Sequence, residues 1–262
     1  MSENDFNPNV IEMRQADIIS LGDAARTIVR DVNWRVQPGE FWIVAGSQHS
    51  GKSDFLMHAA GLTMPTVGEI SVFGCDTRHF GEAQLAERMR VGFVFSGGKL
   101  FSQLTLAENI ALPLRYHKNL SAAEAAGAVQ TFLELFELTP FANLLPASVT
   151  TNWRQRTAMA RALILQPELL LLDNPLAGQA VRQHQWLLNF LDQLWRGHPA
   201  FGGRKMTIVV TADDLRWWRG PQKQFAVLAE NVFTIIGSWN EVAASGEPAV
   251  KELLTGAESL KL

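Results

Sequence analysis

One octet constrains the fold of this chain more than any other feature. Gly46-Ser47-Gln48-His49-Ser50-Gly51-Lys52-Ser53 follows directly after the apolar run Phe41–Ala45. This pattern is a strand leading into a GxxxxGK[ST] phosphate loop, whose consecutive backbone N–H groups cradle phosphate oxygens. A helix predicted over Asp54–Leu62 would present its N-terminus to the same anion. The octet therefore predicts a phosphate-binding site at the end of a strand.

The last two residues of the octet carry its chemistry. Lys52 is expected to reach the β- and γ-phosphates of a nucleotide, and Ser53 to ligate Mg²⁺. The motif is specific because fixed glycines, a lysine and a hydroxyl occur together with a strand before them and a helix after them. The alternative interpretation is a loop rich in glycine and serine that binds no ligand.

Composition excludes several classes of function. Of the 262 residues 47% are hydrophobic and 19% charged, as in a globular protein of one large or two small domains. The net charge of −3 and the lack of a basic stretch argue against nucleic acid as a partner. The single cysteine, Cys75, fits a reducing compartment. Met1–Asp5 does not resemble a signal peptide, and Leu169–Leu172 is too short to span a bilayer, so we expect any membrane role to act through a partner.

The pattern of apolar residues predicts strands that alternate with helices. The predicted strands are Val10–Ile19, Ile28–Val36, Phe41–Ala45, Glu69–Phe73, Val91–Phe95, Leu169–Leu172 and Met206–Thr211, followed by a hairpin over Phe225–Gly237. The predicted later helices are Ser121–Leu138, which begins with a capping box, Asn152–Leu165 and Gln179–Leu194. Continuous apolar strands between helices indicate a parallel sheet covered on both faces. The helical block at about residues 103–165 is interpreted as an insert between sheet strands.

Further segments point to a family. Leu169-Leu170-Leu171-Leu172-Asp173 looks like a Walker B strand, and Pro146–Ala162 lies where a signature segment would stand between the two phosphate motifs. With the phosphate loop after the turn Gln37–Glu40, these segments resemble the ATPases of the ATP-binding cassette (ABC) transporters over almost the whole chain. Leu100–Arg115 and Glu247–Gly256 are similar to the Mce-associated phospholipid transport ATPases of the MlaF type.

The resemblance implies an α/β fold of the P-loop NTPase, RecA-like type. It implies a parallel sheet core, an N-terminal antiparallel β subdomain and an inserted α-helical subdomain. The expected nucleotide-binding domain covers residues 8–240, with the helical insert at about 103–165, and a C-terminal helical tail covers 241–262.

The resemblance also implies the ligands, ATP and Mg²⁺. The implied nucleotide-binding residues are Gly46, Ser47, Gln48, His49, Ser50, Gly51, Lys52, Ser53 and Asp54. Ser53 and Asp173 are the implied Mg²⁺ ligands. His49 stands where the family usually has glycine, and Asp54 replaces a threonine beside the α-phosphate with a negative charge. We therefore expect weakened but not abolished ATP affinity.

Three positions that serve hydrolysis in the family differ here. Asn174 replaces the acidic residue that activates the attacking water, and asparagine cannot accept its proton. Ala212 replaces the switch histidine, and Ser96 the glutamine that senses Mg²⁺ and water. Losing a positioned general base typically costs about 10²–10⁴ in rate. Asp213 and Asp214 are alternative bases, although acidic residues at a helix start are the more ordinary interpretation.

The signature segment is altered as well. Val149-Thr150-Thr151-Asn152 stands where the family has Leu-Ser-Gly-Gly, whose glycines let a helix N-terminus approach the γ-phosphate held by the other subunit. Asn152 followed by Gln155 predicts instead a helix cap that satisfies the free N–H groups of its own chain.

These losses lead to the function expected from sequence. The chain is interpreted as the nucleotide-binding subunit of an ABC transporter for phospholipid or another lipid, working as a homodimer or with a second ABC ATPase. It would be a pseudo-ATPase or a very slow ATPase, docked on an integral-membrane permease at the cytoplasmic face of the cell membrane. Leu100 and Phe101 are expected to contact the permease or, alternatively, to pack inside the insert. The other hypotheses are a nucleotide sensor without a transport role and an active ATPase with a non-family base.

Overall fold

The central sheet is built on the continuous apolar runs of the sequence. In the computed structural model, which describes residues 9–23, 25–79, 81 and 84–255, its order is β10-β9-β3-β8-β7-β6. Strands β9 to β6 run parallel, and β10 pairs antiparallel with β9 at one edge. The six strands are β3 (Phe41–Ala45), β6 (Val91–Val94), β7 (Leu169–Leu172), β8 (Thr207–Ala212), β9 (Gln224–Ala229) and β10 (Val232–Gly237).

The sheet is buried on both faces because successive side chains enter two different cores. Every residue of β3, β7 and β8 is buried. Phe41 and Ile43 pack in the core shared with the helices of the insert, whereas Trp42 and Val44 pack in the core beneath the antiparallel sheet. This period-2 division of an uninterrupted apolar strand is the pattern of a sheet covered on both sides.

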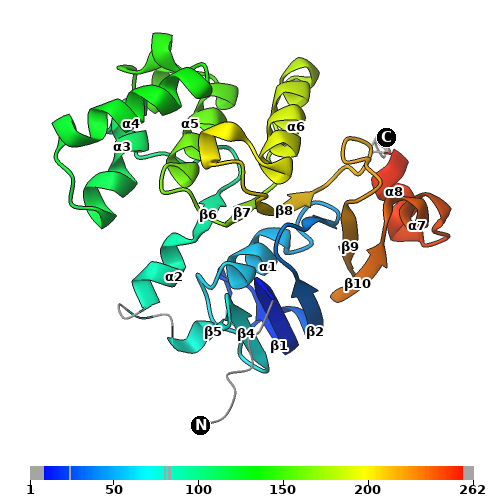
Figure 1. Ribbon diagram of the computed structural model, residues 1–262. Helices are drawn as coiled ribbons and strands as arrows, with labels where there is room; N and C mark the ends of the chain where they lie inside the picture. Colours follow the sequence, from blue (N-terminus) through cyan, green and yellow to red (C-terminus); the bar gives the residue numbers. More distant parts are fainter. Residues whose placement is uncertain (1–8, 24, 80, 82–83, 256–262) are drawn as a thin grey trace.

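A second, antiparallel sheet covers one of these faces, with order β2-β1-β4-β5. Its strands are β1 (Ile11–Ile19), β2 (Thr27–Val36), β4 (Glu69–Val72) and β5 (Cys75–Asp76). Helix α1 (Lys52–Ala59) lies against β1, and its Phe55, Leu56 and Ala59 are buried in the same core. Figure 1 shows α1 above these strands. The helix that follows the phosphate loop is thus held between the two sheets.

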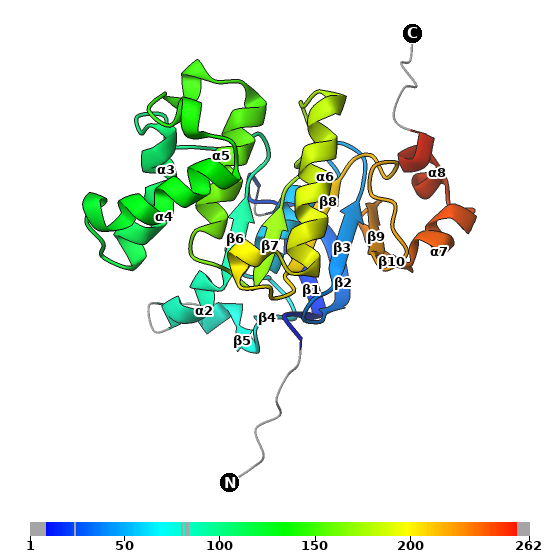
Figure 2. The same cartoon turned by 45° about the horizontal axis from the view of Figure 1, so that its top comes forward.

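Helices cover the other face and the two ends of the central sheet. In chain order they are α2 (Leu85–Met89), α3 (Leu106–His117), α4 (Ala122–Leu135), α5 (Thr151–Leu163), α6 (Val181–Arg196), α7 (Trp239–Ala244) and α8 (Pro248–Thr255). Short 3-10 turns lie at Thr77–His79, Thr139–Phe141, Pro146–Ser148 and Pro199–Phe201. Figure 2 shows α3, α4 and α5 beside β6, with α7 and α8 at the opposite end beside β9 and β10.

The predicted fold class is confirmed: a parallel core sheet, an antiparallel β subdomain and a block of helices inserted between β6 and β7. The capping box predicted at Ser121 is present, with the Ser121 hydroxyl accepting from the backbone N–H of Glu124. The sequence did not predict β5, α2 or separate limits for α3. The division into 8–240 and 241–262 stays a prediction, although Val242, Val250 and Leu253 pack in the main core.

Candidate nucleotide-binding site

The strand order brings the predicted site residues to one edge of the sheet. The phosphate loop follows β3, Asp173 and Asn174 follow β7, and β8 lies between these strands and ends at Ala212. Carboxyl ends of parallel strands are where ligands bind in open α/β sheets. A pocket of about 450 Å³ opens at this edge and is lined by Gln48 to Asp54, Ser96, Asp173, Asn174 and Asp213, among others.

Backbone geometry explains both glycines of the loop. A Cβ on Gly46 would lie 2.6 Å from the carbonyl oxygen of Leu228, and the Gly46 N–H donates to the Ala212 carbonyl at 3.0 Å. Gly51 has a φ of +89°, and a Cβ there would lie 2.1 Å from Ile28 Cγ2. Both positions therefore require glycine, because any side chain would collide with a neighbouring strand.

His49 occupies a conformation that glycine adopts more easily. Its φ is +62°, in the left-handed region, and its side chain is exposed. Left-handed backbone costs a non-glycine residue roughly 1–2 kcal/mol because Cβ approaches the following carbonyl oxygen. His49, which stands where the family usually has glycine, thus introduces local backbone strain into the loop.

Lys52 is folded back onto the loop it belongs to. Its ammonium donates to the carbonyls of Gly46 at 2.8 Å and Ser47 at 2.5 Å, and to Ser50 Oγ at 3.4 Å. The residue is 7% exposed. Burial lowers its pKa, while the negative charges of Asp213 and Asp173 oppose that shift. A buried ammonium with three acceptors at the mouth of the loop is a cation placed to meet an anionic group.

Ser53 and Asp173, the expected Mg²⁺ ligands, are in direct contact. The Ser53 hydroxyl donates to Asp173 Oδ2 at 2.7 Å, and the Thr211 hydroxyl donates to Asp173 Oδ1 at 2.8 Å. The described residues include no cluster of three or more His, Cys, Asp or Glu side chains arranged to hold a metal. A hydroxyl and a carboxylate are nonetheless a donor set that suits Mg²⁺, which keeps waters and substrate phosphates as its other ligands.

Asp54 does not lie free beside the loop. Its Oδ1 accepts a hydrogen bond from the backbone N–H of Leu21 at 3.1 Å, which ties the segment before β2 to the start of α1. Leu21 itself is 46% exposed. The acidic substitution therefore has a local structural partner.

The three positions at which the chain differs from the family's hydrolysis residues lie near the carboxyl edge of the sheet. Asn174 and Ser96 line the pocket. Ala212 ends β8, is 2% exposed and pairs in register with Ala45 of β3. Its methyl group offers no hydrogen bond, so at this position the chain contributes only its backbone carbonyl, which holds Gly46.

Two expectations from sequence are wrong. Helix α5 begins at Thr151, so its N-cap is Thr150, which makes no side-chain cap bond, and Asn152 is buried in the first turn. The side chain of Asn152 therefore does not cap the helix as predicted. Asp213 and Asp214 also do not start a helix, because the fully described segment between β8 and β9 contains only bends and turns. Asp214 instead pairs with Arg216 at 2.7 Å.

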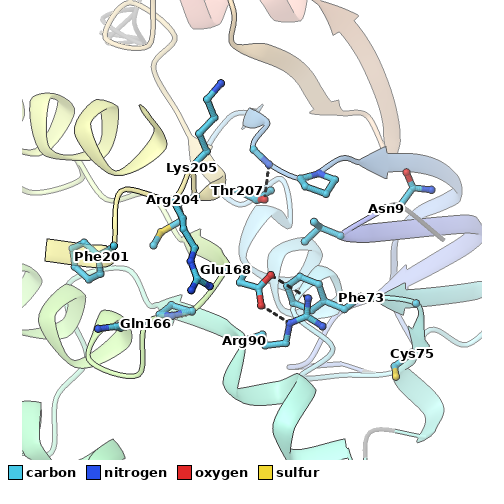
Figure 3. Close-up of a pocket in the computed structure, with 17 residues that line it drawn as sticks. Asn9, Phe73, Cys75, Arg90, Gln166, Glu168, Phe201, Arg204, Lys205 and Thr207 are labelled. Atoms are coloured by element: carbon cyan, nitrogen blue, oxygen red, sulfur yellow. Dashed lines mark hydrogen bonds and ion pairs between the residues drawn. The ribbon is translucent and has the colours of Figure 1, made fainter. Parts of the chain in front are cut away.

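A second pocket, of about 570 Å³, lies at the opposite edge of the sheet (Figure 3). Its lining comes from the amino ends of the strands: Gly39 precedes β3, Glu168 precedes β7 and Thr207 begins β8. The Arg90 guanidinium stacks on Phe73 and pairs with Glu168 at 2.8 Å, as Figure 3 shows. Neither the phosphate loop nor the carboxyl end of a central-sheet strand reaches this pocket, so it is not the candidate nucleotide site.

A third hollow separates the helical insert from the sheet. It measures about 990 Å³ and is lined by apolar side chains that include Leu62, Leu85, Phe101 and Tyr116. Phe101 is 58% exposed, so it does not pack inside the insert, whereas Leu100 packs partly against the core. Among the described residues, no helix combines the length and the apolar character needed to cross a bilayer.

The chain is similar in sequence to known ATP-binding proteins of transporters. A family model described as ABC transporter matches residues 29–177. The phospholipid transport ATP-binding protein MlaF of Escherichia coli K12 is 28% identical over 249 residues, which cover 95% of this chain and 89% of MlaF. The sulfate/thiosulfate import ATP-binding protein CysA of Gloeobacter violaceus is 36% identical over 166 residues, 63% of this chain and 47% of CysA. The chain thus spans about half the length of the CysA relatives it matches.

The fold has a solved counterpart. A dimeric ATP-binding cassette in a post-hydrolysis state, bound to ADP and Pi, superposes with a TM-score of 0.72 at 28% identity. The superposition covers 85% of this chain and 95% of that one.

Proposed function

The chain belongs to the ABC transporter family, and we propose that it is the nucleotide-binding subunit of a lipid transporter, binding ATP but hydrolysing it very slowly or not at all. The proposal rests on the difference between two groups of residues at one site. Lys52, Ser53 and Asp173 keep the contacts of a phosphate and Mg²⁺ site. Asn174 and Ala212, at the ends of the adjoining strands, lack the base and the γ-phosphate contact.

The binding half supports ATP with Mg²⁺. The nine residues from Gly46 to Asp54 would enclose the phosphates, and Lys52 would exchange the loop carbonyls for phosphate oxygens. Ser53 and Asp173 would hold Mg²⁺, which neutralises phosphate charge when it is bound. Left-handed strain at His49 and the negative charge of Asp54 argue for an affinity below that of a consensus loop.

Lipid as the substrate class rests on MlaF, which matches over nearly the full length of this chain, whereas CysA matches over a shorter region. The apolar hollow lined by Phe101 supports a permease as the membrane partner. An exposed apolar surface of this kind, beside a helical insert, suits an apolar helix from another protein. In such an assembly the chain would lie at the cytoplasmic face of the membrane. A second ABC ATPase, identical or different, would complete a dimer, as the solved cassette is dimeric.

The test measures binding and turnover on the same preparation. Titration with a fluorescent ATP analogue should show Mg²⁺-dependent binding, and phosphate release should stay far below that of an ordinary transporter ATPase. Absence of binding at millimolar nucleotide would contradict the binding half of the proposal. Fast phosphate release that Lys52→Ala abolishes would contradict the other half.

A further inference from the structure

A carboxylate stands beside the asparagine that replaces the family base. We propose that Asp213, held by Asn174, is the catalytic carboxylate that accepts the proton of the attacking water in a residual ATP hydrolysis by this chain. The inference rests on the proposed function, because it concerns the slow turnover that a subunit of this kind would retain.

Asp213 lies in the candidate nucleotide-binding pocket. It follows Ala212 directly and lines the same cavity as Lys52, Ser53 and Asn174. The Asn174 Nδ2 donates to Asp213 Oδ2 at 3.0 Å, across 39 positions of sequence. Because a carboxylate only accepts, the atom of Asn174 that faces it is the amide nitrogen, and its Oδ1 is turned the other way.

The pair is fixed to the Mg²⁺ side of the site by an unbroken chain of hydrogen bonds. The Asn174 backbone N–H donates to Thr211 Oγ1 at 2.9 Å, and that hydroxyl donates to Asp173 at 2.8 Å. Asp173 in turn accepts from Ser53. Asp213 is therefore held in register with the residues that would bind Mg²⁺ and the phosphates.

The carboxylates that line the pocket differ in their hydrogen bonds. Both oxygens of Asp173 accept hydrogen bonds, from Ser53 and from Thr211. Asp54 accepts through Oδ1 from the backbone N–H of Leu21, at the first turn of α1. Asp213 accepts through Oδ2 from Asn174, and its Oδ1 has no hydrogen-bond partner among the described residues. Asp213 is thus the carboxylate of this pocket that combines contact with Asn174 and an acceptor oxygen left for a water.

The chemistry of the step balances with the groups named. A water held by Asp213 Oδ1 attacks the γ-phosphorus with an oxygen lone pair. The bond between that phosphorus and the bridging oxygen to the β-phosphate breaks, and its electron pair leaves with ADP. One water proton passes to Asp213, which later releases it to the phosphate product or to solvent. Asn174 positions Asp213 and takes no proton.

The experiment compares adjacent carboxylates in the full chain. Asp213→Asn keeps the shape and an acceptor for Asn174 but removes the base, so residual phosphate release should fall by about 10²–10⁴, the range for a lost general base. Asp214→Asn is the matched control, because Asp214 pairs with Arg216 and does not line the pocket. Asp213→Glu should retain more activity than Asp213→Asn. ATP-analogue binding of each variant is measured alongside.

Three results would overturn the inference: wild-type turnover in Asp213→Asn, equal turnover of the Glu and Asn variants, or wild-type turnover no higher than that of Lys52→Ala. Each of these leaves ATP binding, and so the binding half of the proposed function, intact. Loss of ATP binding by the wild type would instead defeat the proposed function itself. If Asp213→Asn fails to fold, Asp213→Ser keeps a short acceptor and answers the same question.

Discussion

Two groups of residues at the carboxyl edge of the sheet differ in how closely they match the residues of the family. On the α1 side, Lys52 donates to the carbonyl of Gly46, and Ser53 donates to Asp173, which follows β7. Next to Asp173, Asn174 has an amide turned toward Asp213, and Ala212 at the end of β8 is a buried methyl group. We expect ATP binding to depend on the first group of residues and hydrolysis on the second, so that one can weaken while the other stays intact. Four sets of substitutions test this expectation, in decreasing order of effect.

Lys52→Ala should produce the largest change. Removing a buried ammonium whose contacts a phosphate would take over should weaken ATP binding by about 100-fold, since each charge-assisted hydrogen bond contributes about 1.5–3 kcal/mol. Fluorescent nucleotide titration measures it. Lys205→Ala is the control, because Lys205 lines the pocket at the opposite edge of the sheet. Equal affinity of wild type and Lys52→Ala would mean that the retained half does not bind phosphate.

Phe101→Asp should weaken association with the membrane partner by about 30-fold, because a charge on an apolar contact surface costs about 2 kcal/mol. The measurement is co-purification from membranes. Val232→Asp is the control variant. Val232 is 56% exposed and Phe101 is 58% exposed, but Val232 lies on β10 and does not line the hollow. Unchanged association of a folded Phe101→Asp protein would favour a nucleotide sensor without a transport role.

Restoring the family residues at positions 174 and 212 tests the separation directly. Asn174→Glu with Ala212→His should raise phosphate release only about tenfold, below the range of about 10²–10⁴ for a general base. Two causes limit the gain: the glutamate introduced in place of Asn174 would carry its charge close to Asp213, and Thr151 and Asn152 would still alter the signature helix. Adding Asp213→Asn should improve on the double variant by removing that repulsion. A full family rate in the double variant would show that these obstacles are absent.

The smallest expected effect concerns the loop itself. His49→Gly should relieve left-handed strain and stabilise the folded protein by about 1 kcal/mol, with a modest gain in ATP affinity. Thermal unfolding with and without nucleotide measures both. Gln48→Gly is the control, because Gln48 neighbours His49 in the loop but does not have a positive φ. Equal destabilisation by both substitutions would show that position 49 carries no special strain.

The motifs and the strand limits of this protein could be predicted from the amino-acid sequence, because they depend on residues that are adjacent in the chain. The octet from Gly46 to Ser53, the run ending in Asp173 and the strand bounds follow from contiguous patterns, because alternation, turns and helix starts are set within a few residues. The losses at Asn174, Ala212 and Ser96 could also be located in this way, since each adjoins a recognisable strand.

The contacts between residues that are distant in sequence could not be predicted and are seen in the folded chain. Asn174 and Asp213 are 39 positions apart, Leu21 and Asp54 are 33 apart, and Thr211 reaches Asp173 across 38. The contacts of Asp173 and Asn174 with Thr211 and Asp213 exist because β8 lies beside β7, whereas the contact between Leu21 and Asp54 joins the loop between β1 and β2 to α1. Packing also buries Asn152 inside α5 and leaves Phe101 exposed. A linear pattern contains the side chains, but their distances come from the sheet that aligns the strand ends.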